Sequence, residues 1–291
     1  MGRLNDALLV FGGPYSNRQA TEALLAEAKH LGIPPERCIC TGDVVAYCAD
    51  PVATTDLIRD WGCPVVMGNC EESLADGAED CGCGFASGSA CDLLSRQWFE
   101  HASAHLRPDQ RDWMATRPRL IRFELDGYAV AVIHGAVDQI NRFIFASTPD
   151  AEKRSQADLA EADVVLAGHC GLPFTQGLSD GRIWHNAGAI GMPANDNNTA
   201  VWYSLVMPHH GSLRFEHRRL GYDFAAAAAA MRKAGLSEGY ARALETGLWP
   251  NLDVLPAHER AAAGRALTLD QALFDRARRR QLGRDSTFAT E

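Results

Sequence analysis

Four short apolar segments of the chain end beside a glycine and a side chain that can bind a metal ion, and this pattern constrains the fold more than any other feature. The pairs are Gly42-Asp43, Gly68-Asn69, His134-Gly135 and Gly168-His169. Short apolar runs bounded by turn residues are typical of buried strands. Ligands of open α/β sheets bind beyond the carboxyl ends of the strands, so we expect these four side chains to converge.

The first 70 residues alternate between predicted strands and predicted helices. The strands are expected at residues 7–11, 37–40 and 64–67, and the helices at 17–31 and 54–61. Strands separated by helices at this spacing are typical of βαβ units with parallel pairing. The sequence therefore predicts an α/β fold.

Residues 72–92 interrupt this order, because they are rich in Gly, Ala, Ser and Cys, and we interpret them as an inserted loop near the functional face. Further elements are expected along the rest of the chain: helices at 93–105 and 108–116, a hairpin that ends at His134, strands at 163–166, 182–184, 200–206 and 213–218, and helices from 224 to about 280. We divide the chain into a main domain (1–222), a C-terminal helical extension (223–280) and a disordered tail (281–291).

Charge and hydropathy exclude several classes of protein. The 291 residues include 37 acidic and 28 basic side chains, a formal charge of −9, which argues against a protein that binds a nucleic-acid polymer through its phosphates. No run of about 18 apolar residues predicts a membrane span, and the first residues lack the pattern of a secretory signal. We therefore expect a cytoplasmic protein that does not insert into membranes; its oligomeric state is left open.

The four strand-end side chains have the chemistry of a metal site. A carboxylate, an amide oxygen and two imidazoles suit Zn, Fe or Mn. Each residue alone is better explained without a metal, because Gly-Asp and Gly-Asn are common in turns and a single His is usually not a ligand. Four such residues in the same strand-end context favour a shared site, made of Asp43, Asn69, His134 and His169.

Several ordered segments resemble the motif blocks of calcineurin-like metallophosphoesterases. They are TGDVVAYCADP, VMGNCEE, VIHG, AGHCGLPF and WHNAGAIGMPAND, and the resemblance runs from about residue 9 to about residue 236. It implies a four-layer fold in which two mixed β-sheets pack face to face between helices. It also implies hydrolysis of a phosphomonoester or phosphodiester of a small phosphorylated substrate, because members of the family usually use two divalent metal ions for this reaction.

The chain departs from the family pattern at the first metal ion. The family's first strand ends in an Asp-x-His pair, and the matching positions here are Gly13 and Tyr15. The second His of the family's Gly-His-x-His block is Gly171 here. The resemblance therefore implies that the ligands of one ion are lost together, whereas the second set is complete: Asp43, Asn69, His134 and His169. We expect one divalent ion per chain (Zn, Mn or Fe).

A further departure concerns the proton donor. Cys70 stands where the family has a His that commonly acts as general acid toward the leaving oxygen. A thiol can act as ligand or nucleophile when its thiolate is stabilised, but it is a poor proton donor at neutral pH. The candidates for proton handling or contact with phosphate are Tyr15, Cys70 and His185.

Nine cysteines, eight of them between residues 38 and 91, leave three interpretations open. They can be small, buried, reduced thiols. They can include soft metal ligands, in which case Cys48, Cys83 and Cys170 would rebuild the lost set and hold a second ion. They can also form a redox couple within the insertion. The alternatives to a phosphoesterase are therefore a cysteine-modified centre with non-phosphatase or redox chemistry, and a catalytically silent protein that binds a phosphorylated ligand.

Overall fold

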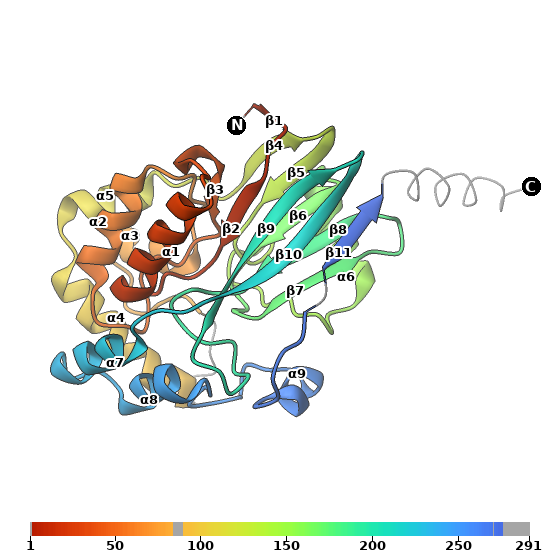
Figure 1. The fold of residues 1–291 in the computed structure, drawn as a ribbon. Helices are drawn as coiled ribbons and strands as arrows, with labels where there is room; N and C mark the ends of the chain where they lie inside the picture. The colour runs from red at the N-terminus through yellow and green to blue at the C-terminus, as the bar shows by residue number, and fades with distance from the viewer. Residues whose placement is uncertain (1, 84–89, 270, 276–291) are drawn as a thin grey trace, which may run out of the picture.

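The computed structural model describes residues 2–83, 90–269 and 271–275, and its strands form two mixed sheets (Figure 1). The six-stranded sheet has the order β1-β4-β5-β6-β8-β7, formed by Arg3–Leu4, Ile121–Leu125, Tyr128–Val132, Val164–Ala167, Ile183–Ala187 and Pro173–Gly177. The five-stranded sheet has the order β11-β10-β9-β2-β3, formed by Ala272–Asp275, Ser212–Leu220, Val201–His209, Leu8–Phe11 and Cys38–Cys40. Parallel pairs join β2 to β3, β5 to β6 and β6 to β8, while β4-β5, β7-β8 and β9-β10 are antiparallel.

The two sheets pack face to face, and alternate residues of each strand contribute to the core between them. In β2, Leu8 and Val10 face the six-stranded sheet, whereas Leu9 and Phe11 face the helices on the other side. This period of two and the burial of both faces follow from the pleat of a covered strand. The predicted pair of mixed sheets flanked by helices is confirmed.

The helices form the outer layers. The outer face of the five-stranded sheet is covered by α1 (Arg18–His30), α2 (Pro51–Trp61), α3 (Asn69–Asp76), α4 (Ala90–His105), α5 (Pro108–Ala115), α7 (Phe224–Lys233) and α8 (Glu238–Thr246) (Figure 1). Helix α6 (Asp150–Leu159) packs on the outer face of the six-stranded sheet, where Ala157 meets Ala131 and Val165. A short 3₁₀ helix (Pro35–Arg37) and α9 (Ala257–Ala262) complete the described elements. None of the helices in the described part of the chain combines the length and apolar character that crossing a membrane requires.

Several parts of the sequence prediction differ from the structure. Residues 272–275, expected in the helical extension, form β11, which pairs with the edge of β10. Residues 64–67 contribute a single bridge, between Cys40 and Val65, and the elements α6 and β7 were not predicted. The predicted insertion begins inside α3; its residues 84–89, like the predicted tail at 281–291, lie outside the described residues.

Candidate metal centre

Four side chains that follow buried strands meet at one edge of the two sheets. Asp43 lies in the loop after β3, and Asn69 is the first residue of α3. His134 follows β5 and His169 follows β6 in the other sheet. The residues come from both sheets, so the site depends on the packing of the two sheets and not on one local motif.

The potential ligand atoms of these four residues face one another. His134 Nε2 lies 3.2 Å from Asp43 Oδ2, 3.1 Å from Asn69 Oδ1 and 3.1 Å from His169 Nδ1. The ligand atoms of Asp43, His134 and His169 lie within 4.8 Å of one another, and within the described residues no other group of three His, Cys, Asp or Glu side chains does so. Asp43, Asn69 and His134 are all at most 4% exposed.

The hydrogen bonds around His134 show that this group is suited to a cation. His134 Nδ1 lies 2.6 Å from the carbonyl oxygen of Thr41, which can only accept, so Nδ1 donates and Nε2 carries the lone pair in the neutral ring. That Nε2 faces the side-chain oxygens of Asp43 and Asn69, which are acceptors too. Several lone pairs therefore converge where only a proton or a metal ion can satisfy them.

Burial and charge act on the protonation of the same residues. Burial alone would lower the pKa of His134, but the charge and hydrogen bond of Asp43, together with the Thr41 carbonyl group and the charge of Glu71, outweigh burial and raise that pKa. Burial and the neighbouring His134 lower the pKa of His169 to about 3, so its ring stays neutral. Without an ion, a proton on His134 balances Asp43; a bound metal ion would displace that proton.

Asn69 is oriented by the segment that precedes the undescribed residues. Its Nδ2 donates to the carbonyl oxygen of Cys81 over 2.8 Å and lies 3.3 Å from Cys83 Sγ. Because both amide hydrogens point toward this segment, Oδ1 is turned toward His134. Ligand-orienting contacts of this kind are typical of metal sites.

Glu71 was not among the expected site residues, although the structure gives it a central position. Its fully buried carboxylate accepts hydrogen bonds from the backbone amides of Asp43, Val44 and Gly68, over 2.7, 2.7 and 2.9 Å. Burial and the charge of Asp43 raise its pKa to about 7. The only sequence signal was its place in the first turn of α3, three residues after Gly68, where an acidic side chain can bond back to the preceding backbone.

The three positions that the resemblance assigns to the first metal ion, Gly13, Tyr15 and Gly171, lie together. A Cβ atom on Gly13 would overlap the phenol ring of Tyr15, which is folded back over that glycine. A Cβ atom on Gly171 would lie 3.8 Å from the Tyr15 hydroxyl and 3.6 Å from the Trp249 ring. The Tyr15 ring therefore fills the space next to Gly13 that an aspartate side chain would need. Burial, followed by the charge of Asp43, raises the pKa of Tyr15 well above its usual value, so the phenol keeps its proton.

Several residues around the site have a left-handed backbone. Tyr15, Asp43 and His169 have φ values of 52°, 56° and 60°. Backbone hydrogen bonds hold the loop that carries Tyr15 to the loop that carries Asp43, among them those from Gly13 to Gly42 and from Tyr15 to Asp43, over 3.1 and 3.2 Å. Positive φ values in non-glycine residues cost of the order of 1–3 kcal/mol each and cluster at functional sites.

The candidate cysteines differ in where their sulfur atoms point. Cys48 Sγ faces the carbonyl oxygen of Gly191 over 3.7 Å, and Cys170 Sγ faces that of Leu172 over 3.6 Å. Cys70 is buried beside the site, where its backbone amide donates to Asp43 Oδ1 over 3.2 Å. Cys83 lies behind the Asn69 amide and hydrogen-bonds to Cys70. All eight cysteines whose side chains are described are buried, free thiols, and burial raises the pKa of Cys170 to about 12 and that of Cys70 well above its usual value.

The structure places His185 away from these ligands, contrary to the expectation that it approaches phosphate. It lies within β8, between the sheets, where its Nδ1 meets Thr175 Oγ1 over 2.8 Å and its Nε2 meets Ser204 Oγ over 2.6 Å. Its ring stacks on His217 at 4.9 Å. Both nitrogens are therefore engaged in a buried hydrogen-bond network, because the alternation of β8 turns this side chain toward the other sheet.

Comparisons with known proteins agree with this architecture. No protein-family model matches the chain. It is 24% identical over 237 residues to the uncharacterized protein MJ0912 of Methanocaldococcus jannaschii, a match that covers 76% of this chain and 89% of that protein. Among solved structures, it is similar to a metallophosphoesterase from Sphaerobacter thermophilus, with a TM-score of 0.64, 20% identity, and coverage of 84% of this chain and 100% of that one. It is also similar to the hypothetical protein PH1004 from Pyrococcus horikoshii OT3, with a TM-score of 0.69, 16% identity, and coverage of 86% and 100%.

Proposed function

This chain has the calcineurin-like metallophosphoesterase fold, and we propose that it hydrolyses a phosphate ester of a small substrate with one divalent metal ion. The observation that carries the proposal is the convergence of Asp43, Asn69, His134 and His169, whose facing side-chain oxygen and nitrogen atoms are of the kinds that bind a metal ion. An ion bound there would polarise a phosphoryl oxygen and lower the pKa of a bound water molecule.

One ion rather than two is favoured by the position of Tyr15. Its ring occupies the space beside Gly13, and neither Gly13 nor Gly171 can supply a ligand. The two-nitrogen, two-oxygen donor set suits Zn, Mn or Fe. The sulfur atoms of Cys48 and Cys170 face backbone carbonyl groups instead, and the geometry therefore favours the phosphoesterase over a cysteine-modified centre.

The remaining residues at the site are assigned roles in binding and proton transfer. Tyr15 keeps its proton, so its hydroxyl can donate a hydrogen bond to a phosphate oxygen on the side where the family has its other ion. Cys70 occupies the place of the family's general acid. Because burial keeps its thiol protonated, we expect at most a modest contribution to protonating the leaving oxygen. The buried free thiols also favour a reducing, cytoplasmic setting.

The test is the metal content and activity of protein purified without oxygen or chelator. Plasma mass spectrometry should find about one ion per chain in the wild type and in Cys70→Ala, and much less in Asp43→Asn and His169→Ala. Hydrolysis of p-nitrophenyl phosphate and bis-p-nitrophenyl phosphate, with Zn, Mn or Fe(II) added, should depend on the same two residues. Two ions per chain, or wild-type activity in Asp43→Asn, would contradict the proposal.

A further inference from the structure

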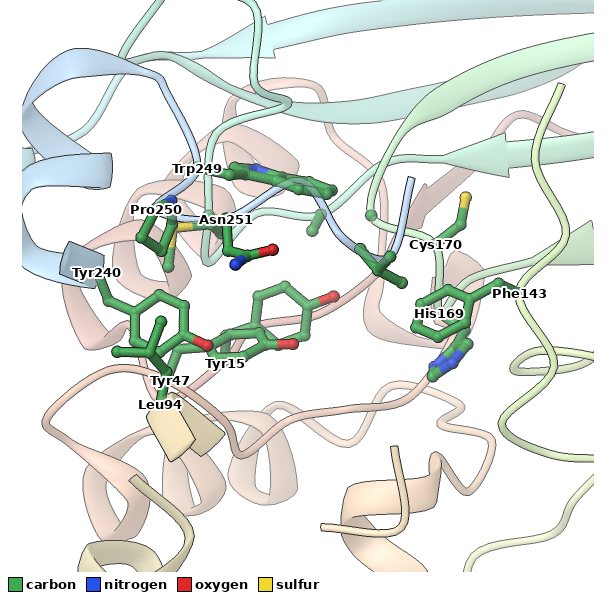
Figure 2. A pocket seen from close by; sticks show the side chains of 14 residues that line it. Tyr15, Tyr47, Leu94, Phe143, His169, Cys170, Tyr240, Trp249, Pro250 and Asn251 are labelled. Carbon is green, nitrogen blue, oxygen red and sulfur yellow. The ribbon is translucent and has the colours of Figure 1, made fainter. Parts of the chain in front are cut away.

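A cavity lined by aromatic side chains opens directly beside the candidate metal centre. It has an empty volume of about 670 Å³, including the space open to solvent at its mouth. Its aromatic residues are Tyr15, Tyr47, Phe143, Tyr240 and Trp249, and His169 forms the end nearest the metal ligands (Figure 2). Phe143 packs on the His169 ring with 4.1 Å between ring centroids, so the cavity continues to a ligand of the proposed ion.

The charge of the cavity restricts what can occupy it. None of the described residues that line it is Lys, Arg, Asp or Glu. A second phosphate group would find no cation to pair with there, and a charged amine would find no carboxylate. The part of the substrate that enters the cavity is therefore uncharged, whereas the phosphate group stays at the metal centre.

The cavity walls are held in place before any ligand binds. Trp249 donates from Nε1 to the carbonyl oxygen of Pro193 over 2.6 Å, and its backbone amide donates to Asn195 Oδ1 over 2.8 Å. On the opposite side, the Tyr47 ring lies 4.9 Å from the rings of both Tyr15 and Tyr240. Preorganised aromatic walls of this kind favour flat ring systems, which gain stacking contacts without ordering the protein.

Polar groups are set into these apolar walls. The three tyrosine rings lie side by side with their hydroxyl groups directed into the cavity, and the amide of Asn251 projects between them and Trp249 (Figure 2). A phenol is protonated at neutral pH, so the hydroxyl groups of Tyr15 and Tyr47 can donate hydrogen bonds. The polar edge of a nucleobase offers hydrogen-bond partners to the hydroxyl groups of Tyr15 and Tyr47, whereas a purely aliphatic group or a trimethylammonium group offers none.

We propose that the cavity binds the nucleobase of a nucleoside phosphate ester, with the base between Trp249 and the tyrosines and the phosphate at the metal centre. This inference rests on the proposed function and specifies its substrate class. Tyr240 and Trp249 come from α8 and the segment after it, so the C-terminal part of the chain supplies the specificity for the base.

The experiment compares two substrates that share the 5′-phosphate ester of ribose and differ in the base, AMP and ribose 5-phosphate, on the metal-loaded protein. The ratio of their kcat/KM values should favour AMP by about 5- to 150-fold, the range of one base–aromatic stacking contact. The ratio should fall toward one in Trp249→Ala and Tyr240→Leu. Trp249→Phe, which keeps a ring, should retain part of the preference, and Trp113→Leu, which removes an aromatic side chain from α5 outside the cavity lining, should leave the ratio unchanged.

Two further measurements separate this inference from the proposed function. A ratio near one in the wild type, or a preference for phosphocholine or octyl phosphate over AMP, would overturn the nucleobase pocket while leaving the phosphoesterase intact. Isothermal titration calorimetry with adenosine against ribose reports on the pocket without turnover. Binding of adenosine that is weakened in Trp249→Ala would support the pocket even if no ester were hydrolysed, and failure of adenosine to bind would refute it.

Discussion

The claim that the Tyr15 ring closes the first-metal position can be tested by substituting Gly13. A methyl group on Gly13 would overlap the ring, and the glycine has φ = +43°. The left-handed backbone at Gly13 should by itself make Gly13→Ala cost about 1–2 kcal/mol of unfolding free energy, the usual cost of a left-handed residue with a side chain. The overlap should add about 1–3 kcal/mol, as overpacking of a filled core does. We therefore expect Gly13→Ala to lower the free energy of unfolding by about 2–5 kcal/mol.

A matched control isolates the overlap. Gly62 also has a positive φ, +74°, at the C-terminal end of α2, and a Cβ atom there would meet nothing within 4 Å. Gly62→Ala should therefore show only the free-energy cost of a left-handed backbone. The difference between the two variants, measured by urea unfolding of metal-free protein, is the energetic effect of placing a methyl group against the Tyr15 ring.

A double-mutant cycle then attributes the overlap to Tyr15. Tyr15→Leu keeps an apolar side chain but removes the ring, so Gly13→Ala in that background should cost about as much as Gly62→Ala does in the wild type. The coupling energy should be about 1–3 kcal/mol, within the range that contacting residues show. If Gly13→Ala cost no more than Gly62→Ala, or if the two substitutions were additive, the ring would not occupy this space. The structural argument for a single ion would then fail.

Three other predictions follow from the described contacts. Glu71→Gln removes an acceptor from the three backbone amides that fix the Asp43 loop. The affinity for metal, measured by calorimetric titration, should therefore fall by about 10- to 100-fold. Unchanged affinity would show that Glu71 does not position that loop. A metal concentration of about 100 times the dissociation constant should stabilise the wild type by about 2.7 kcal/mol in thermal or urea unfolding. Asp43→Asn should lose this stabilisation. Equal stabilisation of both proteins would show that the ion binds elsewhere. Burial lowers the pKa of His217 to about 4, and burial together with the nearby His217 holds the pKa of His185 well below its usual value. Between about pH 4 and 6.5 these two side chains bind more protons in the unfolded chain than in the folded one, so together they should contribute a rise in stability with pH of up to about 2.7 kcal/mol per unit. His217→Gln should reduce this slope and the exposed His210→Gln should not; an unaltered slope in His217→Gln would refute the assignment.

The sequence predicted those features that depend on local pattern and on the ends of strands. The apolar runs before Asp43, His134 and His169 predicted three of the strands. The position of each polar residue directly after its strand predicted that the three side chains meet at one edge of the sheets. The pairing of β11 with β10 could not be predicted in this way, because residues 272–275 are short and find a strand conformation only through the edge of another strand. The position of His185 could not be predicted for a related reason. It lies next to one of the segments that resemble the family motifs, but the alternation of side chains within β8 turns it into the space between the sheets.

The contributions of Glu71 and Trp249 required tertiary structure to be seen. An acidic residue in the first turn of a helix is common. Nothing in the local sequence indicates that the carboxylate of Glu71 accepts hydrogen bonds from the backbone amides of three residues in two loops. Trp249 lies 78 positions after Gly171 in the chain, and it reaches the site only because the segment after α8 folds back over the loop that follows β6.

Tyr15 links the proposed single ion to the aromatic cavity. Its ring covers Gly13, its hydroxyl faces the position of Gly171, and the same ring forms part of the cavity wall next to Tyr47. A histidine at position 171 would project toward Trp249 and the Tyr15 hydroxyl, so the glycine at the position where the resemblance predicts a metal ligand also leaves room for the cavity. The triple variant Gly13→Asp, Tyr15→His and Gly171→His is therefore expected to gain an ion and lose the nucleobase preference together. If the two properties changed independently in such variants, the replacement of the first-metal ligands and the formation of the cavity would be separate features of this fold.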